Sequence, residues 1–165
     1  MFHIHKKKRR TCCKHKRQNK ILEKIEITKQ PTKISYYVGE SDLDISGLEV
    51  TGTYNDGSSK IESVTLSDIS GFTTATSGEK TLTVSISGKT ATFKITVNAV
   101  VLTGISVTKE PTKTSYYVGD STLNISGLEV TGTYNDGSSK IESVTLANIS
   151  GFTTATSGEK TLTVS

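Results

Sequence analysis

The chain has 165 residues and a mass of 17.7 kDa, which is room for one ordinary domain or two small ones. Its net charge of +4 is unevenly divided: residues 1–20 hold nine Lys or Arg and no acid, whereas residues 21–165 hold eleven Lys or Arg and sixteen acids. From residue 21 onward there is no His, Cys or Trp, which excludes most hydrolytic triads, thiol chemistry and His- or Cys-ligated metals there.

The first segment, residues 1–21, is predicted to be a disordered basic tail. Its Lys and Arg residues cluster at 6–10 and 14–17 and could contact nucleic-acid phosphates or anionic lipid head groups. We disfavour nucleic acid as a partner, because Phe2 is the only aromatic residue of the tail and base stacking needs aromatic side chains. A solvated arm without a partner accounts for the same charge.

The tail also holds every His and Cys of the chain, namely His3, His5, Cys12, Cys13 and His15. Their spacing does not fit a zinc finger, because adjacent cysteines rarely converge on one tetrahedral ion and no CxxC pair follows. No metal and no cofactor is therefore predicted. The basic start resembles the first part of a signal peptide, but no apolar region follows, so the sequence predicts neither an export signal nor a membrane span.

An internal repeat organises the rest of the chain. Residues 22–85 match residues 102–165 with a shift of 80 and no gaps, and 53 of the 64 positions are identical. A unit of this length can fold by itself, unlike the short unit of a solenoid. We therefore predict a first domain at 22–98, a linker at 99–101 and a second domain at 102–165.

The first copy begins with apolar residues that alternate with polar ones, which is the pattern of a strand with one buried face. Ile25 and Ile27 start this pattern, and Leu48, Val50 and Tyr54 continue it in a second strand. Because Tyr54 is in phase with Val50, we expect it to lie in the core.

The later part of the first copy predicts a turn and a hairpin. The turn is Asn55-Asp56-Gly57, since Gly accepts positive φ and Asp can bond its own backbone. The hairpin has a turn at 87–89, and its alternating apolar positions are Leu82, Val84, Ile86, Phe93, Ile95 and Val97. About five to seven short strands with turns every ~8–12 residues indicate an all-β sandwich.

The order of these features resembles the bacterial immunoglobulin-like domains of group 3. The matching stretches include Ile25-x-Ile27, Pro31-x-Lys33, Gly47-Leu48-x-Val50, Tyr54-Asn55-Asp56-Gly57-Ser58, Gly78-x-Lys80-Thr81 and Ala91-x-Phe93-x-Ile95-x-Val97. Each stretch is short, but the ordered series occurs twice within residues 22–165. The resemblance implies tandem immunoglobulin-like β-sandwich domains of a bacterial surface protein, where such copies space a binding or catalytic domain from the wall or take part in adhesion.

The second copy stops at Ser165 and lacks a counterpart of residues 86–98. Those residues hold four side chains predicted for the core, and at about 1.5–3 kcal/mol each their loss removes roughly 6–12 kcal/mol. A whole domain has a net stability of about 5–15 kcal/mol, so we expect the second copy to be marginal or unfolded by itself. Two explanations stay open: a fragment, which we favour, and a domain that an incoming strand completes at its open edge.

Acids of the first copy are candidates for calcium binding or for glycoside hydrolysis. They are Glu40, Asp42, Asp44, Glu49, Asp56, Glu62 and Asp68. Most fall in turns or on outward strand positions, so we expect a solvated acidic surface instead of a site. Asp42 and Asp44 become Thr122 and Asn124 in the second copy, so the acidic cluster is not repeated. No catalytic, cofactor-binding or metal-binding residue is predicted.

The tyrosines are candidates for a sugar-binding platform of exposed rings. They are Tyr36, Tyr37, Tyr54, Tyr116, Tyr117 and Tyr134. Because only one of two adjacent strand residues can point inward, we expect them to pack in the core and at its rim instead.

The sequence thus predicts a non-enzymatic spacer or adhesion module of a bacterial cell-surface or secreted protein, with neighbouring domains of that protein as partners. Its linker, residues 99–101, is short and apolar, and we expect it not to swing freely. The alternative is a carbohydrate- or ligand-binding accessory module of a larger extracellular enzyme, with cell-wall or host glycans or proteins as partners. The extracellular location follows from the resemblance alone.

Overall fold

The computed structural model describes residues 19–165, so nearly all of the predicted basic tail, with its His and Cys residues, lies outside the described residues. Strands dominate the described residues, and two short 3₁₀ turns are their helical segments. Neither turn has the length and apolar character that crossing a membrane requires. The predicted all-β class is confirmed.

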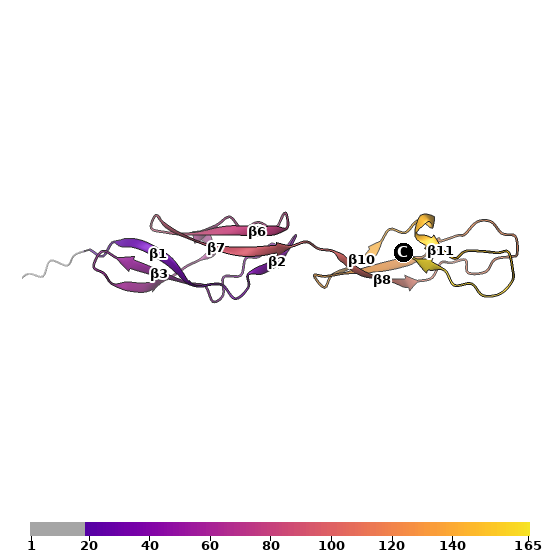
Figure 1. The fold of residues 1–165 in the computed structure, drawn as a ribbon, viewed down its shortest axis with the longest axis horizontal. Helices are drawn as coiled ribbons and strands as arrows, with labels where there is room; N and C mark the ends of the chain where they lie inside the picture. Colours follow the sequence, from indigo (N-terminus) through magenta and orange to yellow (C-terminus); the bar gives the residue numbers. More distant parts are fainter. Residues whose placement is uncertain (1–18) are drawn as a thin grey trace, which may run out of the picture. The chain divides into compact units, whose positions relative to one another are not determined.

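The first repeat is a sandwich of two sheets, seen as two layers in Figure 1. One sheet has the strand order β1-β3-β4, with β1 at Leu22–Lys29, β3 at Glu49–Tyr54 and β4 at Ser59–Glu62. Neighbouring strands are antiparallel, and Val50 lies opposite Ile27 on one side and Glu62 on the other. The predicted tight turn joins β3 to β4, with Gly57 at φ +79°.

The facing sheet has the strand order β2-β7-β6-β5. Its strands are β2 at Ser35–Tyr37, β5 at Ile69–Ser70, β6 at Gly78–Ile86 and β7 at Lys89–Asn98, and a 3₁₀ turn at Leu66–Asp68 precedes β5. The predicted hairpin of β6 and β7 is confirmed, since a two-residue loop with positive φ at Ser87 and Gly88 joins them. β2 runs parallel to β7, with Ser35 opposite Thr96 and Tyr37 opposite Asn98.

Both sheets of the first repeat contribute buried side chains to one core. The buried apolar residues are Ile25, Tyr36, Val50, Leu82, Val84, Phe93, Ile95 and Val97. The alternation seen in the sequence therefore identifies the inner faces. Tyr54 is half-buried, so its predicted place in the core is wrong; it is the last residue of β3 and lies beside the turn.

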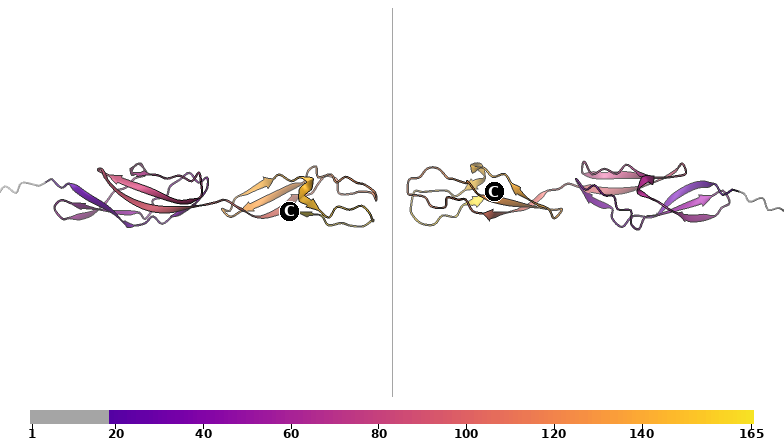
Figure 2. Two further views of the ribbon diagram at one scale, coloured as in Figure 1. Left: turned by 45° about the horizontal axis from the view of Figure 1, so that its top comes forward. Right: turned by 180° about the vertical axis from the view of Figure 1, so that it is seen from behind.

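The second repeat reproduces one sheet of the first and only part of the other. Its complete sheet has β8 at Leu102–Lys109, β9 at Glu129–Tyr134 and β10 at Ser139–Glu142, in the register of β1, β3 and β4. After a second 3₁₀ turn at Leu146–Asn148, β11 at Ile149–Ser150 pairs with β12 at Thr163–Val164. Figure 2 shows this shorter pair from two further sides.

Among residues 19–165, no sheet combines strands of the two repeats. The distances between Cα atoms nevertheless divide the chain into two compact units that do not coincide with the two repeats. The second unit contains the whole second repeat and also residues 35–42, 73–80 and 95–98 of the first repeat. The domain boundaries at 22–98, 99–101 and 102–165 therefore stay a prediction.

Candidate functional site

Two of the acids considered as calcium ligands hold turn backbones. An oxygen of the Asp44 carboxylate accepts a hydrogen bond from Ser46 N at 2.8 Å. The Asp68 carboxylate, at the end of the 3₁₀ turn, accepts hydrogen bonds from Thr65 N at 2.8 Å and from Thr65 Oγ1 at 2.7 Å. These contacts lower the pKa of both carboxyl groups, with the Ser46 and Thr65 hydroxyls as the largest causes. Each carboxylate thus caps its own turn.

The second repeat makes the same caps without the charge. Asn124 replaces the first of these aspartates and accepts a hydrogen bond from Ser126 N at 2.8 Å. Asn148 replaces the other and accepts hydrogen bonds from Thr145 N at 3.0 Å and from Thr145 Oγ1 at 2.9 Å. Because an amide oxygen serves as well as a carboxylate, these positions need an acceptor for a backbone N–H and not a negative charge.

Asp56 holds the turn between β3 and β4. Its Oδ1 accepts hydrogen bonds from Ser58 N at 3.0 Å and Ser58 Oγ at 2.5 Å, and Lys20 Nζ lies 3.0 Å from Oδ2. The Ser58 hydrogen bonds, followed by the Lys20 contact, lower the pKa of Asp56 from 3.8 to about 2. In the second repeat Asp136 makes the same two contacts with Ser138, at 2.9 and 2.6 Å.

Glu62 is not hydrated as predicted, because its side chain is only 10% exposed. Its carboxylate accepts a hydrogen bond from Tyr54 Oη at 2.5 Å and lies 3.2 Å from Lys60 Nζ. The Tyr54 hydroxyl is the largest cause of a lowered pKa of Glu62, and hydrogen bonds with Tyr54 and Glu62 raise the pKa of Lys60. A Cβ at Gly52 would clash with the Glu62 carboxylate, so the glycine makes room for it.

The second repeat contains the same cluster of tyrosine, glutamate and lysine. Tyr134 donates a hydrogen bond to Glu142, and Lys140 Nζ lies 4.7 Å from the centre of the Tyr134 ring. Gly132 again leaves the space that the glutamate fills. Composition and alternation do not predict this cluster. The signal that marks it in the sequence is a glycine at an inward strand position, where a side chain from the neighbouring strand must enter.

The remaining acids do not converge on one point. Glu40 accepts a hydrogen bond from Tyr37 N at 2.7 Å, Glu49 lies 3.3 Å from Lys29 Nζ, and Asp42 is exposed. In the part of the chain that the structure describes, no three His, Cys, Asp or Glu side chains lie close enough together to hold a metal ion.

The tyrosines do not form matching platforms in the two repeats. Tyr36 is fully buried and Tyr37 is half-buried. In the second repeat Tyr116 packs edge-on against Phe152, with ring centres 5.1 Å apart and an angle of 73°, and Tyr117 is 85% exposed. The predicted packing in the core and at its rim therefore describes Tyr36 and Tyr37 better than it describes Tyr116 and Tyr117.

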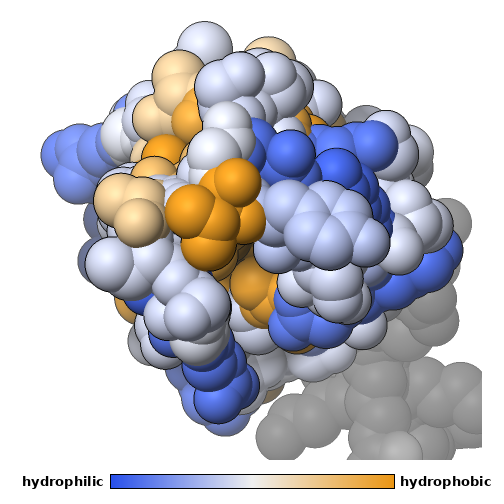
Figure 3. Space-filling model, turned by 90° about the vertical axis from the view of Figure 1, so that its right-hand side faces the viewer, coloured by the Kyte–Doolittle hydropathy of each residue, from blue (hydrophilic) through white to orange (hydrophobic). Residues whose placement is uncertain are grey.

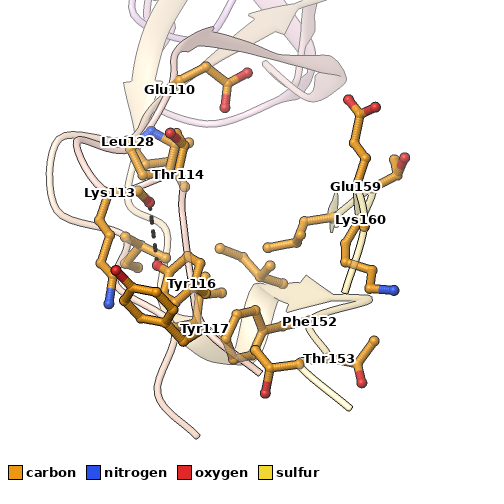
Figure 4. Close-up of a pocket in the computed structure, with 18 of the residues that line it drawn as sticks. Glu110, Lys113, Thr114, Tyr116, Tyr117, Leu128, Phe152, Thr153, Glu159 and Lys160 are labelled. Atoms are coloured by element: carbon orange, nitrogen blue, oxygen red, sulfur yellow. Dashed lines mark hydrogen bonds between the residues drawn. The ribbon is translucent and has the colours of Figure 1, made fainter. Parts of the chain in front are cut away.

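A groove of about 770 Å³ opens in the second repeat, and three of the residues that line it, Tyr116, Leu162 and Val164, are identical to buried core residues of the first repeat (Figure 4). Its apolar lining includes Val107, Tyr116, Leu123, Phe152, Leu162 and Val164. Tyr116 and Tyr117 lie on one wall, and Glu159 and Lys160 lie on the opposite one. The lining of the groove thus combines apolar side chains with charged ones.

The exposed fractions of equivalent residues show that the core of the second repeat is open to solvent. Ile25 is 4% exposed and its counterpart Ile105 is 42% exposed; Leu82 is fully buried and its counterpart Leu162 is 37% exposed. In the space-filling view of Figure 3, apolar residues reach the surface between hydrophilic ones at the far end of this repeat. The apolar side chains at these positions are thus more exposed in the second repeat than in the first.

The profile of the bacterial Ig-like domain (group 3) matches residues 29–97 and 109–165. The two matches fall on the two copies of the internal repeat.

Two curated relatives share part of this sequence. A pectate lyase L of Thermoclostridium stercorarium is 40% identical over 116 residues, which is 70% of this chain and 9% of the relative. An exo-beta-1,6-galactobiohydrolase of Bifidobacterium longum subsp. longum is 45% identical over 74 residues, which is 42% of this chain and 5% of the relative. The chain therefore spans less than a tenth of the length of either relative.

Proposed function

Since the chain belongs to the bacterial Ig-like domain (group 3) family, we propose that its two repeats form a non-catalytic spacer module of a larger bacterial surface or secreted protein. The small share of each relative that the chain matches supports a module within a longer protein. The acidic side chains support a structural role. Most of those that have a partner in the structure either cap a turn or contact a residue of their own repeat. The proposed partners are neighbouring domains of the same protein, and adhesion stays a prediction.

The observation that carries the proposal is an asparagine clamp on the segment leading into each repeat. Asn135 accepts a hydrogen bond from Val101 N at 2.9 Å and donates one to Ala99 O at 3.0 Å. The backbone N–H of Asn135 also donates to Val101 O at 3.1 Å. These contacts support a linker at residues 99–101 that is held against the second repeat and does not swing freely.

Asn55 makes the same three contacts in the first repeat. It accepts a hydrogen bond from Ile21 N at 3.0 Å, and it donates to Asn19 O at 3.4 Å and to Ile21 O at 3.0 Å. A clamp that recurs in both copies suits a string of domains in which each copy holds the end of the segment before it. Such joints keep the spacing between neighbours more constant than a flexible linker does.

The spacer proposal is tested by Asn135→Ala in the full chain. ¹⁵N relaxation of residues 99–101 should show order parameters close to those of the strands in the unmodified protein and clearly lower ones in the variant. Asn55→Ala, which removes the clamp of the other repeat, is the matched control and should leave residues 99–101 unchanged. A linker that is already as mobile as a free terminus in the unmodified protein would refute the proposal.

A second candidate is a carbohydrate-binding accessory module of an enzyme. It is favoured by the names of the two relatives, a pectate lyase and an exo-beta-1,6-galactobiohydrolase, and by the high exposure of Tyr117. Affinity electrophoresis of the full chain in gels containing pectate or β-1,6-galactan distinguishes the candidates. A spacer should migrate unretarded, whereas retardation that disappears in Tyr117→Ala would establish the binding module.

A further inference from the structure

β4 forms an open edge of the first repeat. In the sheet β1-β3-β4 it pairs, among the described residues, with β3 alone, and its register with β3 has no bulge. The opposite edge of the sheet is β1, whose register with β3 is irregular near both ends of the strand. Bulges of this kind protect an edge from pairing with another chain, and β4 lacks that protection.

The turn before β4 fixes which of its backbone groups point away from β3. Tyr54 N donates a hydrogen bond to Ser58 O at 2.9 Å, so the ladder of β3 and β4 starts there with a hydrogen-bonded pair. Hydrogen-bonded and non-hydrogen-bonded pairs alternate in an antiparallel ladder, so every second residue from Ser58 bonds to β3. The backbone N–H and C=O groups of Ser59 and Ile61 therefore point away from the sheet.

The side chains of this edge follow the same alternation. Glu62 lies opposite the buried Val50 and marks the inner side of β4, so Ile61 lies on the outer side. The Ile61 side chain is 63% exposed, and its counterpart Ile141, in the middle of β10, is 66% exposed. Because β10 pairs with β9 in the register of β4 with β3, both repeats present an exposed isoleucine on an open edge.

The sequence of the edge is complementary to itself in one antiparallel register. Residues 59–63 read Ser-Lys-Ile-Glu-Ser, so two copies that meet at Ile61 place Lys60 of each opposite Glu62 of the other. A shift by two residues in either direction places like charges opposite each other, and so does a parallel alignment in register. A shift by one residue joins the inner side of one sheet to the outer side of the other.

We propose that β4 and its equivalent β10 are docking edges for a second copy of this chain, paired antiparallel with an isoleucine at the centre. Ile61 of each copy donates a backbone hydrogen bond to Ile61 of the other and accepts one from it. The two isoleucines cover each other on the outer side, and the contacts of Lys60 with Glu62 flank them on the inner side. Two separate sheets thereby become one continuous sheet.

This association goes beyond the spacer function, because it joins one chain to another. The edge is short and the area that it buries is small, so the dimer forms weakly and reversibly. Weak contacts of this kind would hold chains together where they are concentrated and leave dilute chains as monomers.

A second copy suits the edge better than an unrelated strand does. An edge lysine discourages pairing with most other strands. A matching strand needs a carboxylate opposite Lys60, a cation opposite Glu62 and an apolar side chain between them. Both β4 and β10 meet this requirement, since residues 58–66 and 138–146 are identical.

The test follows the full chain by sedimentation velocity and ¹H–¹⁵N NMR in a concentration series up to about 1 mM, because the contact is small. The dimer population should rise with concentration, and the amides of residues 59–63 and 139–143 should shift. A chain that stays monomeric throughout would overturn the proposal. Shifts confined to other residues, including the groove of the second repeat, would overturn it as well.

The register is read from a mixture of ¹³C-labelled and unlabelled chains. Lys60 and Glu62 of different copies form a non-hydrogen-bonded pair, which brings their Hα atoms close together. A filtered NOE between these two Hα atoms, or between those of the equivalent Lys140 and Glu142, should therefore appear across chains. A dimer whose intermolecular NOEs join other residues would contradict the proposed pairing.

A pair of variants separates edge pairing from non-specific association. Ile61→Lys together with Ile141→Lys places two lysines opposite each other and should weaken dimerisation at least about tenfold. Leu66→Lys together with Leu146→Lys is the matched control, because these leucines are 56% and 52% exposed and lie in the 3₁₀ turns, outside the edge. The control should dimerise like the unmodified chain. Equal losses in both variants would overturn the proposal.

Mixing two variants tests the pairing without relying on a loss. Chains with Ile61→Asp and Ile141→Asp should fail to dimerise by themselves, as the lysine chains do. The two kinds of chain should associate when mixed, because each lysine then lies opposite an aspartate. All four substitutions fall on exposed side chains, and the ¹H–¹⁵N spectra show whether each variant is folded. Folded variants that do not associate on mixing would overturn the proposal.

Discussion

At the residue scale, Asp56 and Asp136 hold the same turn in the two repeats but differ in one neighbour. Lys20 Nζ lies 3.0 Å from Asp56, whereas the corresponding position before the second repeat is Val100. The pKa of both carboxyl groups is lowered by the serine two residues later, and only that of Asp56 is lowered further by a lysine. The chain therefore contains its own matched pair for measuring the effect of one cation on a capped aspartate.

We predict that Lys20→Ala raises the pKa of Asp56 from about 2 toward that of Asp136. Because the pKa of Asp56 is depressed in the folded state, its contribution to stability is present above pH 3.8 and is lost as the pH falls toward 2. In the variant the contribution should be smaller, and its loss should be complete at a higher pH. Carboxyl ¹³C chemical shifts, followed from pH 6 to pH 1.5, measure both aspartates at once. An unchanged Asp56 titration would show that the serine contacts alone set its pKa.

The cluster of Tyr54, Glu62 and Lys60 predicts a second residue effect. Tyr54→Phe removes the hydrogen bond to a carboxylate whose side chain is only 10% exposed, and it should cost about 1–3 kcal/mol of unfolding free energy. The pKa of Glu62 should rise, since the hydroxyl is the largest cause of its depression. The Glu62 contribution, present above pH 4.5 and lost on acidification, should then be smaller.

Urea unfolding at pH 7 and pH 4, resolved for the first repeat by NMR, measures this loss. Tyr117→Phe is the control, because Tyr117 is 85% exposed and its change should stay within about 0.5 kcal/mol. Equal effects of the two substitutions would mean that the Tyr54 hydroxyl gains nothing from its hydrogen bond to Glu62.

At the element scale, β7 decides whether its neighbours are buried. Leu82 and Leu162 stand in identical local sequences, yet the first is fully buried and the second is 37% exposed. We predict that Leu82→Ala destabilises the first repeat by about 2–5 kcal/mol, the range for a buried leucine, and that Leu162→Ala costs the second repeat less than about 1 kcal/mol. Native-state hydrogen exchange reports each repeat separately. Equal costs would show that the groove is closed in solution.

The strands that local alternation predicts are those with one apolar face, such as β1, β3, β6 and β7. β2 has no such signal, because its three residues become a strand only by pairing with β7, far along the chain. Residues 115–117 demonstrate this, since the same Ser-Tyr-Tyr sequence is irregular where, among residues 19–165, no strand equivalent to β7 pairs with it. Local propensity therefore identified the long strands and could not identify a strand made by a distant partner.

Only part of the candidate site could be predicted from the sequence, because some of its features also depend on residues that are distant along the chain. The turn at Asn55–Gly57 and the capping role of aspartate in turns follow from local chemistry. The burial of Glu62 depends instead on the space above Gly52 in the neighbouring strand, which composition and alternation do not report. The groove is lined by segments that come from separate parts of the second repeat.

At the scale of the whole molecule, the two repeats should unfold separately. The first repeat has two complete sheets, whereas the second lacks most of one. We predict two steps in urea, with residues 102–165 unfolding at the lower concentration and residues 22–98 at the higher one. Hydrogen exchange with mass spectrometry, read at each urea concentration, assigns the steps. A single step shared by all amides would show that the two repeats unfold as one unit, against the prediction of independent domains.

The order of synthesis matters for a protein built in this way. β7 is the last of the seven strands of its repeat to leave the ribosome, and it emerges before the second repeat does. The first sandwich can therefore close before a nearly identical competitor exists. When the chain is refolded from denaturant, the strands of two nearly identical repeats form at once, which favours cross-repeat mispairing. Newly made protein should therefore reach its final form with fewer exchanged species than refolded protein does.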